Sequence, residues 1–498
     1  MDKIKYAVIG SGPASQFTLE GLLSSGVKLD DVIIFEAGGK SDLPKSSKRI
    51  DFKNLPIKTE SRNIQFGGTS NTWSKLCSVF DENEIRLLKK GDNSWKDVYE
   101  QLSPIYSELS KEYDFPVISV ENQNLFGSNI AFRVRKFETI SSTLKNEQIR
   151  RMFSRTKLFH KLLFFKKIDG KYVLYFQNLI TKEEYNFSCE NLVLACGGLE
   201  NIRILLDSFK GTEKSYKVVG KYFTNHPKFR AGKVSFNNYQ DVSQFIGFME
   251  KGKSSYHGIS LSSEELKSHL NHYVRLEPIY PWTDDFLTSK FIYYMSFSKS
   301  FISGIFSRKI LLLSMSELEK IKEPFNEGNE GINITPIFKY FLCRMGLTKP
   351  RTSDYYVRNY LEMQATWENN VTICKADKLP SNIIVDYKIG DREIKSFYAL
   401  HAKLADCFNS IGAKYEFPSF DSIEQFSADA SHHCGGTIIG SSSKNSVVSA
   451  NLELHDYKNC FVVGSSVFPS SGSVNPTFTI AALGLRLGRF LGIRKNAS

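Results

Sequence analysis

The chain has 498 residues and a mass of 56.7 kDa, which exceeds one domain of ordinary size and predicts two. Hydrophobic residues make up 41% of it and charged residues 24%, as is typical of an ordinary soluble globular protein. The formal net charge is +12, but lysine and arginine are spread along the sequence. This argues against a nucleic-acid partner and favours only a field that attracts anionic substrates.

The eight cysteines are sparse for a chain of this length, and they form neither a CxxC pair nor the spacing of a zinc site. We therefore expect reduced thiols in a cytoplasm and no metal. The first residues, MDKIKYAVIG, enter a strand at once and lack the pattern of a secretory signal. A cytoplasmic protein is the expectation.

A strand, a glycine-rich turn, a helix and a second strand follow one another within residues 5–36. The turn reads GxGxxS, which differs from the dinucleotide fingerprint only in its third position, and Glu36 follows at about the 20-residue spacing of a ribose-binding acid. Because such an acid accepts a hydrogen bond from a free ribose 2′-OH, NAD or the ADP half of FAD is favoured over NADP. The expected contacts with the nucleotide are Gly10, Gly12, Pro13, Ala14, Ser15 and Glu36.

A second glycine-rich loop, GGTSNTW, occupies residues 67–73. Its backbone can lie against a flat ligand, and the alternative is a surface loop anchored by its tryptophan. A helix is predicted from Ser94, and a hairpin is predicted within residues 161–179. Residues 192–198 predict another buried strand that ends in glycines, with a helix after it.

Glycine turns of the nucleotide-binding type disappear between residues 220 and 426, which marks a second domain. His226 precedes a proline and predicts an extended loop, in which a structural role is favoured over a catalytic one. Residues 291–315 are apolar and aromatic, but their uncharged runs are shorter than the ~20 residues of a membrane span. They predict a core helix, with a helix on the inner membrane surface as the alternative. Residues 355–374 predict paired strands that form the floor of a substrate pocket.

The last part of the chain, from residue 460 to residue 490, predicts a strand, a Ser/Gly/Pro loop and a helix. Asn475 occupies the place of an N-cap, and Pro476 occupies that of a first helical residue. The free N–H groups that follow, from Thr477 onward, attract negative charge. On these residues alone, a capped helix that closes a doubly wound sheet is the favoured interpretation.

Two adjacent histidines, His432 and His433, lie in the loop SHHCGGTIIG. A metal site is not favoured, because adjacent side chains diverge and no third ligand has a supporting spacing. A neutral imidazole in a partly dry pocket is suited to taking a proton from an alcohol near neutral pH. The alternative is a packed or exposed histidine without a catalytic role.

Several segments, taken in order, resemble the glucose–methanol–choline (GMC) flavin oxidoreductases. They are the turn at residues 10–15 with Glu36, then GGTSNTW, LACGGLENIRILL, GKYFTNHP, HHCGGTIIG and GSSVFPSSGSVNPTFTIAALGLRL. The pattern is most similar to bacterial members related to pyranose oxidase and cholesterol oxidase, and it covers both ends of the chain better than the middle. The resemblance implies an α/β fold: a Rossmann-like FAD-binding domain of discontinuous segments and an α+β substrate domain built on an antiparallel sheet.

The implied domain boundaries follow from where these segments lie. The FAD-binding domain is expected at residues 1–95, 130–220 and 428–498, and the substrate-binding domain at 221–427. Residues 96–129 are expected to form a connecting helix and loop.

The same resemblance implies roles for individual residues. His432 matches the catalytic base of the family and Asn475 its partner, while His433 is secondary. Where pyranose oxidase carries the histidine that links covalently to the flavin, this chain has Thr72, so noncovalent FAD is expected. The other implied cofactor contacts lie in the second glycine loop and around the last helix: Gly67, Gly68, Thr69, Asn71, Thr72, Gly464, Ser465, Pro476 and Thr477.

The residues and the resemblance together predict FAD-dependent oxidation of an alcohol to a carbonyl, with hydride transferred to flavin N5 and His432 as the base. The expected substrate is a small-molecule alcohol, a sugar, glycoside or sugar-containing metabolite. Two alternatives are an FAD-containing lyase and a membrane-associated binding protein with a vestigial flavin site. Oxidase and dehydrogenase are both compatible with the sequence, and no oligomeric state is predicted.

Overall fold

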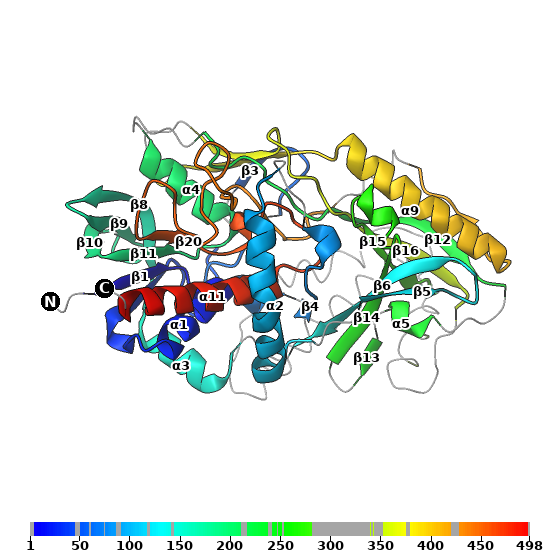
Figure 1. Ribbon diagram of the computed structural model, residues 1–498, viewed down its shortest axis with the longest axis horizontal. Coiled ribbons are helices and arrows are strands. Elements are labelled where there is room, and N and C mark those ends of the chain that lie inside the picture. Colours follow the sequence, from blue (N-terminus) through cyan, green and yellow to red (C-terminus); the bar gives the residue numbers. More distant parts are fainter. Residues whose placement is uncertain are drawn as a thin grey trace, which may run out of the picture.

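The computed structural model describes residues 4–496 apart from several internal stretches. These stretches are residues 45–49, 59–60, 74, 86–90, 117–119, 141–143, 211–216, 238–241, 247, 251–252, 281–338, 340–341, 343–351, 375–378 and 420–427. The segment 291–315, for which a core or membrane-surface helix is predicted, therefore lies outside the described residues. Figure 1 shows two groups of elements along the long axis of the molecule, with helix α2 (Ser94–Tyr113) running between them.

A five-stranded parallel sheet forms the centre of the first group. Its strands in spatial order are β20 (Cys460–Val462), β11 (Asn191–Leu194), β1 (Tyr6–Ile9), β2 (Val32–Glu36) and β7 (Thr156–Leu158). The central strands are short apolar runs because a parallel sheet is covered on both faces. The first and last strands of the chain both pair with β11, so the two ends of the sequence meet in one sheet.

Helices cover this sheet on both sides (Figure 1). Helices α1 (Pro13–Ser24) and α11 (Thr477–Asn496) lie together on one side, with α3 (Asn146–Ser154) next to α1, and α4 (Gly198–Phe209) lies on the other side. A three-stranded antiparallel sheet of β8 (His160–Ile168), β9 (Lys171–Asn178) and β10 (Glu184–Cys189) extends the group. The predicted hairpin is confirmed, because β8 and β9 pair around Asp169 and Gly170, which both have positive φ.

A nine-stranded, largely antiparallel sheet forms the second group. Its main path is β19 (Lys414–Glu416), β12 (Lys228–Ser235), β16 (Asp354–Tyr360), β15 (Tyr273–Pro278), β14 (Lys253–Ser260), β6 (Ala131–Thr139) and β4 (Leu76–Cys77), with β13 (Phe248–Glu250) and β5 (Val120–Asn124) at its side. Helix α9 (Asp391–Ser410) packs on one face of this sheet through a separate apolar cluster. The other face is directed toward the first group of elements.

The remaining elements are short. A third sheet contains β17 (Asn370–Ile373), β18 (Ile383–Tyr387) and β3 (Ile50–Asn54). Helix α5 (Ser243–Ile246) and five 3₁₀ turns complete the described elements: η1 (Leu29–Asp31), η4 (Gly68–Asn71), η5 (Glu82–Glu84), η6 (Glu265–Lys267) and η7 (Ser465–Val467). Of these, η4 and η7 border the site described below.

The predicted fold class is confirmed, but the predicted pairing within residues 355–374 is wrong. Both strands form, yet β16 pairs with β12 and β15, whereas β17 pairs with β18 in a different sheet. Alternating side chains indicate a strand but do not specify its partner. Strand β6, which lies in the range expected for the FAD-binding domain, pairs with β14 of the large sheet. The division into domains stays a prediction.

Two general properties concern thiols and membranes. The seven cysteines in the described part of the chain are free thiols, and most of them are buried. Among the helices built from described residues, none has the length and apolar composition needed to cross a bilayer.

Helices α1 and α11 pack with their backbones in near contact. A Cβ atom on Gly21 would lie 2.4 Å from the carbonyl oxygen of Leu485, and one on Gly488 would lie 2.2 Å from that of Thr18. Neither distance leaves room for a carbon atom. Glycine is therefore required at both positions for the helices to approach this closely.

We predict that Gly488→Ala lowers the free energy of unfolding by about 1–3 kcal/mol, because the added methyl group forces the two helices apart. Ile493 lies in the same helix with 65% of its surface exposed, so Ile493→Ala should change that free energy by no more than about 0.5 kcal/mol. Urea unfolding followed by circular dichroism measures both variants. Equal stability of the two variants would contradict the close packing.

Candidate active site

A cavity of about 680 Å³ lies at the carboxyl ends of the parallel strands, between that sheet and the large antiparallel sheet. Open α/β sheets bind ligands at this edge. Segments far apart in the sequence form the wall, including the turn after β1, η4, the start of α4 and the loop after β20. The predicted site residues in this wall are Gly10, Gly12, Pro13, Ala14, Glu36, Gly68, Thr69, Thr72, His432, His433, Gly464, Ser465, Asn475, Pro476 and Thr477.

Three predicted cofactor contacts do not line the cavity. Ser15 is buried in α1, and its Oγ has no hydrogen-bond partner among the residues that the structure describes. The N–H of Gly67 donates to Ser11 Oγ at 3.0 Å, and the exposed Asn71 amide donates to two backbone carbonyls of its own loop at 2.9 Å. Gly67 and Asn71 therefore shape the second glycine loop rather than its cavity surface.

The two glycines of the first turn have different functions in the structure. Gly10 has a φ of 95°, and a Cβ atom there would lie 2.5 Å from the carbonyl oxygen of Ala195 at the end of β11. Gly12 has ordinary extended backbone, and a Cβ atom there would meet nothing within 4 Å. Gly10 is thus needed for the fold, whereas the open side of Gly12 leaves space for a ligand against the start of α1.

Glu36 is buried at the end of β2 and anchors the same turn. Its carboxylate accepts hydrogen bonds from Ser11 Oγ at 2.6 Å, from Ser11 N–H at 3.0 Å and from Gly38 N–H at 2.9 Å. Burial raises the pKa of this carboxyl, and the hydrogen bonds act in the opposite direction. Glu36 holds the turn and also lines the cavity. Its carboxylate could therefore accept a further hydrogen bond from a ribose hydroxyl.

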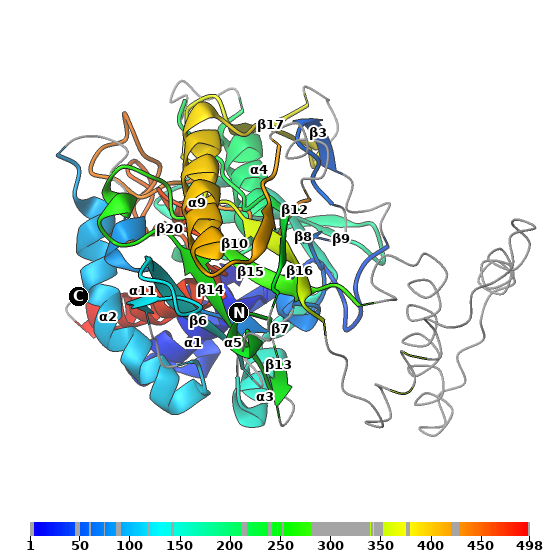
Figure 2. The same ribbon diagram turned by 90° about the vertical axis from the view of Figure 1, so that its right-hand side faces the viewer.

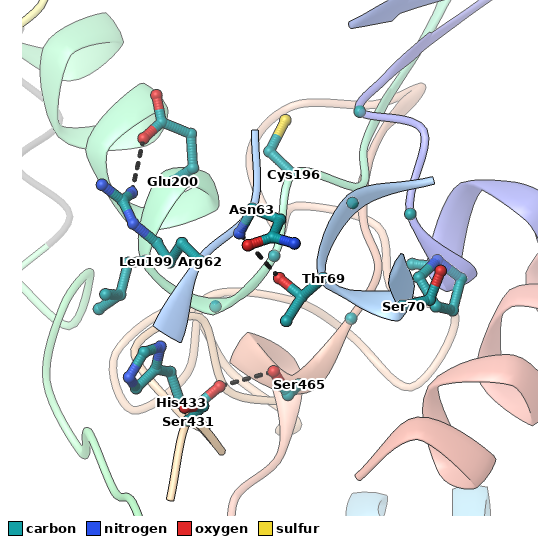
Figure 3. Close-up of a pocket in the computed structure, with 18 of the residues that line it drawn as sticks. Arg62, Asn63, Thr69, Ser70, Cys196, Leu199, Glu200, Ser431, His433 and Ser465 are labelled. Atoms are coloured by element: carbon teal, nitrogen blue, oxygen red, sulfur yellow. Dashed lines mark hydrogen bonds and ion pairs between the residues drawn. The ribbon is translucent and has the colours of Figure 1, made fainter. Parts of the chain in front are cut away.

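A charged cluster near the nucleotide end of the cavity could not be found from motifs. Arg62 pairs with Glu200 at 3.2 Å, as Figure 3 shows, and Glu200 also pairs with the buried Arg203 at 2.7 Å. Burial opposes ionisation of Glu200, but Arg203, Lys161 and Arg62 together lower its pKa to about 2. These residues come from three distant segments, and the only local signal is the presence of charges within an otherwise apolar helix.

His432 and Asn475, the two residues that the family resemblance pairs, lie together in the wall of the cavity. Asn475 Nδ2 lies 3.3 Å from His432 Nε2, although the two residues are 43 positions apart. Helix α11 starts at Thr477, and the Pro476 carbonyl accepts its first bond from Ile480 N–H at 2.9 Å. The Asn475 side chain is therefore directed toward the histidine instead of the N-cap position expected from the sequence.

His432 is held in its neutral form. Its pKa lies well below the ordinary value, mainly because the ring is buried, and next because of the neighbouring His226 and Lys228. The His226 ring packs edge-on against it with 5.1 Å between centroids, and burial lowers the pKa of His226 to about 4. Asp429 acts in the opposite direction on His432 but does not offset the burial.

Asp429 helps to hold the loop of residues 431–440, called the histidine loop below, in place. Its carboxylate accepts bonds from Ser431 N–H at 2.6 Å and Asn225 Nδ2 at 2.8 Å, and lies 3.4 Å from His433 Nε2. Asn225 Oδ1 in turn accepts a bond from His432 N–H at 3.3 Å. Burial raises the pKa of Asp429, but the charge of His433 and these bonds dominate and keep it below its usual range. His433 thus contacts the carboxylate that holds the loop, whereas His432 contacts Asn475.

Aromatic and basic side chains of the large sheet form the wall opposite the parallel strands. Tyr273 and Tyr360 stack with 4.5 Å between ring centroids, and the Tyr256 hydroxyl lies 3.2 Å from that of Tyr273. Lys228 and Arg275 line the same wall. None of these residues was singled out from the sequence, because only the strand register brings them together.

Comparisons with known proteins agree with this fold and site. A family model described as GMC oxidoreductase matches residues 365–484. Over 102 residues the chain is 33% identical to the fructose dehydrogenase large subunit of Gluconobacter japonicus, a match that covers 20% of this chain and 18% of that subunit. The chain thus matches less than a fifth of that relative's length.

Two solved structures share the architecture. Pyridoxine 4-oxidase from Mesorbium loti has a TM-score of 0.61 at 13% identity, over 98% of this chain and 99% of that one. A fungal aryl-alcohol oxidase has a TM-score of 0.57 at 12% identity, over the full length of both chains.

A parallel, dinucleotide-type sheet and an antiparallel sheet enclose the cavity, and this architecture is shared with the two solved oxidases. The predicted resemblance to the GMC oxidoreductases is confirmed by the family model over residues 365–484 and by the match to the fructose dehydrogenase subunit, and GMC oxidoreductases use FAD. The cavity fits this group: the open side of Gly12 could hold the pyrophosphate, Glu36 the ribose, and the start of α11 an electron-rich edge of the flavin.

We predict that Gly12→Val folds but loses FAD. A Cβ atom at this position has no described protein atom within 4 Å, so the valine side chain would occupy the space proposed for the pyrophosphate. Flavin absorbance of the purified protein measures the bound FAD, and circular dichroism measures the fold. Gly10→Ala is the contrasting variant, since it should lower stability through the clash with β11. A Gly12→Val protein that keeps full FAD occupancy would show that the cofactor lies elsewhere.

Proposed function

We propose that this protein is an FAD-dependent enzyme that oxidises the CH–OH group of a sugar or sugar-containing metabolite to a carbonyl, with His432 as the base. One observation carries the proposal: His432 and Asn475 meet at 3.3 Å in the wall of the cavity that also contains the dinucleotide turn. Two polar side chains from distant loops thus converge on the place where a reacting hydroxyl could lie. The match to a fructose dehydrogenase subunit supports a sugar as the substrate.

Each residue of this pair is assigned one role in the proposed reaction. Bound FAD would supply the hydride acceptor at flavin N5. The amide nitrogen of Asn475 can only donate, so His432 Nε2 accepts and carries the lone pair that a base requires. His432 then takes the hydroxyl proton, while Asn475 holds the hydroxyl so that its carbon faces the cofactor. The N–H groups from Thr477 onward are placed to stabilise negative charge at the start of α11.

Anaerobic flavin reduction tests the proposed reaction. The holoprotein is mixed with a panel of sugars and glycosides without oxygen, and the loss of yellow flavin absorbance is recorded. Bleaching by a member of the panel, with formation of the carbonyl product, is the expected result. Substrate conversion without bleaching would instead identify the lyase alternative, and a bound flavin with no conversion of any kind would support the binding-protein alternative.

We predict that His432→Ala slows flavin reduction by about 10²–10⁴-fold, the usual contribution of a general base, and leaves FAD bound. Stopped-flow absorbance measures the rate, and the flavin spectrum reports occupancy. His257 is half-buried on β14 and lies outside the cavity wall, so His257→Ala serves as the control. A His432→Ala enzyme with the wild-type reduction rate would disprove the assignment of the base.

The pH dependence of reduction should reflect the lowered pKa of His432. Because the ring stays neutral, we expect a constant rate near neutral pH and a fall only below the ordinary histidine pKa of about 6.5. Lys228→Met removes a neighbouring cation, which raises the pKa of His432 and moves the acid fall to higher pH. Lys96, 61% exposed on α2, provides the control Lys96→Met. If the reduction rate falls at the same acidic pH in the wild type and both variants, Lys228 does not affect the pKa of His432.

A further inference from the structure

Strands β12, β16 and β15 are neighbours in the large sheet, and their side chains alternate between its two faces. One face is apolar and packs against α9, with Val234, Val274 and Val357 in the same buried cluster as Leu400 and Leu404. Figure 2 shows α9 running alongside these strands. The alternate residues therefore lie on the opposite face, and four of them, Lys228, Tyr273, Arg275 and Tyr360, line the cavity.

Strand register arranges these alternate residues in rows, because residues directly opposite each other share a face. The first row is Lys228, Tyr360 and Tyr273, and the second row is Arg230, Arg358 and Arg275. Neighbouring strands are about 4.8 Å apart and successive rows about 7 Å apart. Four cations thus share an area about 10 Å wide on a single sheet face.

The acidic side chains nearby do not balance these cations. Glu277 pairs with both Arg230, at 2.7 Å, and Arg275, at 2.6 Å. Within the described parts of the chain, neither Lys228 nor Arg358 has a carboxylate at ion-pair distance. The Nε of Arg358 is buried without any hydrogen-bond partner in the same described parts.

Asp429 does not supply the missing charge. Burial and the positive charges of Arg358 and Lys58 lower the pKa of Lys228, and Asp429 acts in the opposite direction without offsetting them. Stacking accounts for two of the cations, since the guanidinium of Arg230 lies 5.3 Å from the Tyr356 ring centroid and that of Arg275 lies 5.3 Å from the Tyr256 centroid. It does not account for Lys228 and Arg358.

One of the uncompensated cations, Lys228, lies next to the proposed base. Lys228 exchanges backbone hydrogen bonds of 3.1 and 3.0 Å with Ala428, which lies four residues before His432 in the sequence. A cation held in a partly buried wall without a counter-charge is unfavourable unless a ligand brings one. Lysine and arginine donors arranged in this way bind phosphate or carboxylate oxygens through charge-assisted hydrogen bonds.

We propose that this face of β12, β16 and β15 is an oxyanion site, and that the alcohol substrate carries a phosphate or carboxylate bound by Lys228 and Arg358. The inference rests on the proposed oxidation of a sugar-type alcohol and narrows its substrate class to anionic sugars. The stacked tyrosines lie in the same row as Lys228, so a sugar ring would pack against them while its anionic group contacts the cations.

Isothermal titration calorimetry of the FAD-loaded full chain with inorganic phosphate at low salt tests the site without turnover. We expect Lys228→Met/Arg358→Met to raise the dissociation constant at least about tenfold, and Lys228→Arg to preserve binding. The matched control is Lys96→Met/Lys267→Met, which removes the same total charge from side chains that are 61% and 69% exposed. Equal phosphate affinity in the two double variants would overturn the proposal. If the double variant does not fold, the single exchanges Lys228→Met and Lys228→Arg are compared instead.

Further ligands, titrated without oxygen, identify the substrate class. D-glucose 6-phosphate and D-glucuronate should each bind more tightly than D-glucose, and the difference should vanish in Lys228→Met/Arg358→Met. Cosedimentation with vesicles that contain phosphatidylinositol, lost in the same variant, would identify a lipid headgroup as the source of the phosphate. Equal affinity for the charged and neutral sugars would disprove the anionic substrate.

The two proposals fail in different ways. If the anions bind as expected but no alcohol reduces the flavin, the oxyanion site stands and the proposed oxidation fails. If neutral sugars reduce the flavin as fast as their anionic counterparts in every variant, the oxidation stands and the oxyanion site fails.

Discussion

The near contact between the backbones of α1 and α11 is the constraint on which the rest of the molecule depends. Because no side chain separates the helices at Gly21 and Gly488, the two ends of the sequence are held in one layer against the parallel sheet. Their first turns then open onto the same cavity, so Gly12 and Thr477 line one wall. Residues near the start and near the end of the sequence thus become neighbours in the cavity wall through helix packing.

The histidine loop illustrates how a buried carboxylate can be used for positioning. Asp429 would be costly to bury alone, but it accepts several hydrogen bonds and lies beside His433, which together compensate its loss of hydration. The neighbouring His432 has no such compensation at its Nδ1 atom and remains neutral. The two adjacent histidines therefore differ in their surroundings, because His433 contacts Asp429 and His432 contacts Asn475.

Local signals predicted the parts of the structure that depend on local chemistry. The GxGxxS turn, the hairpin at Asp169 and the histidine loop all follow from residues close together in sequence. The partners of each strand could not be predicted in this way. Alternating side chains identify a strand but not the strand it pairs with, and β16 and β17 accordingly lie in separate sheets. The pairing of Arg62 with Glu200 and the rows of cations depend on register and tertiary contact, which no motif encodes.

The loop that carries His432 is hydrogen-bonded to both groups of elements at once. Ala428 and Cys434 pair through their backbones with Lys228 and Thr224 on the substrate side. A little further on, the N–H groups of residues 435, 437 and 439 donate to the carbonyls of residues 465–467 on the nucleotide side. Main-chain bonds to both groups, together with the contacts of Asp429 and Asn225, thus fix where the imidazole lies. Most side chains that line the remainder of the cavity take no part in these bonds, so they could diverge among relatives and change the shape of the cavity while the histidine stays in place.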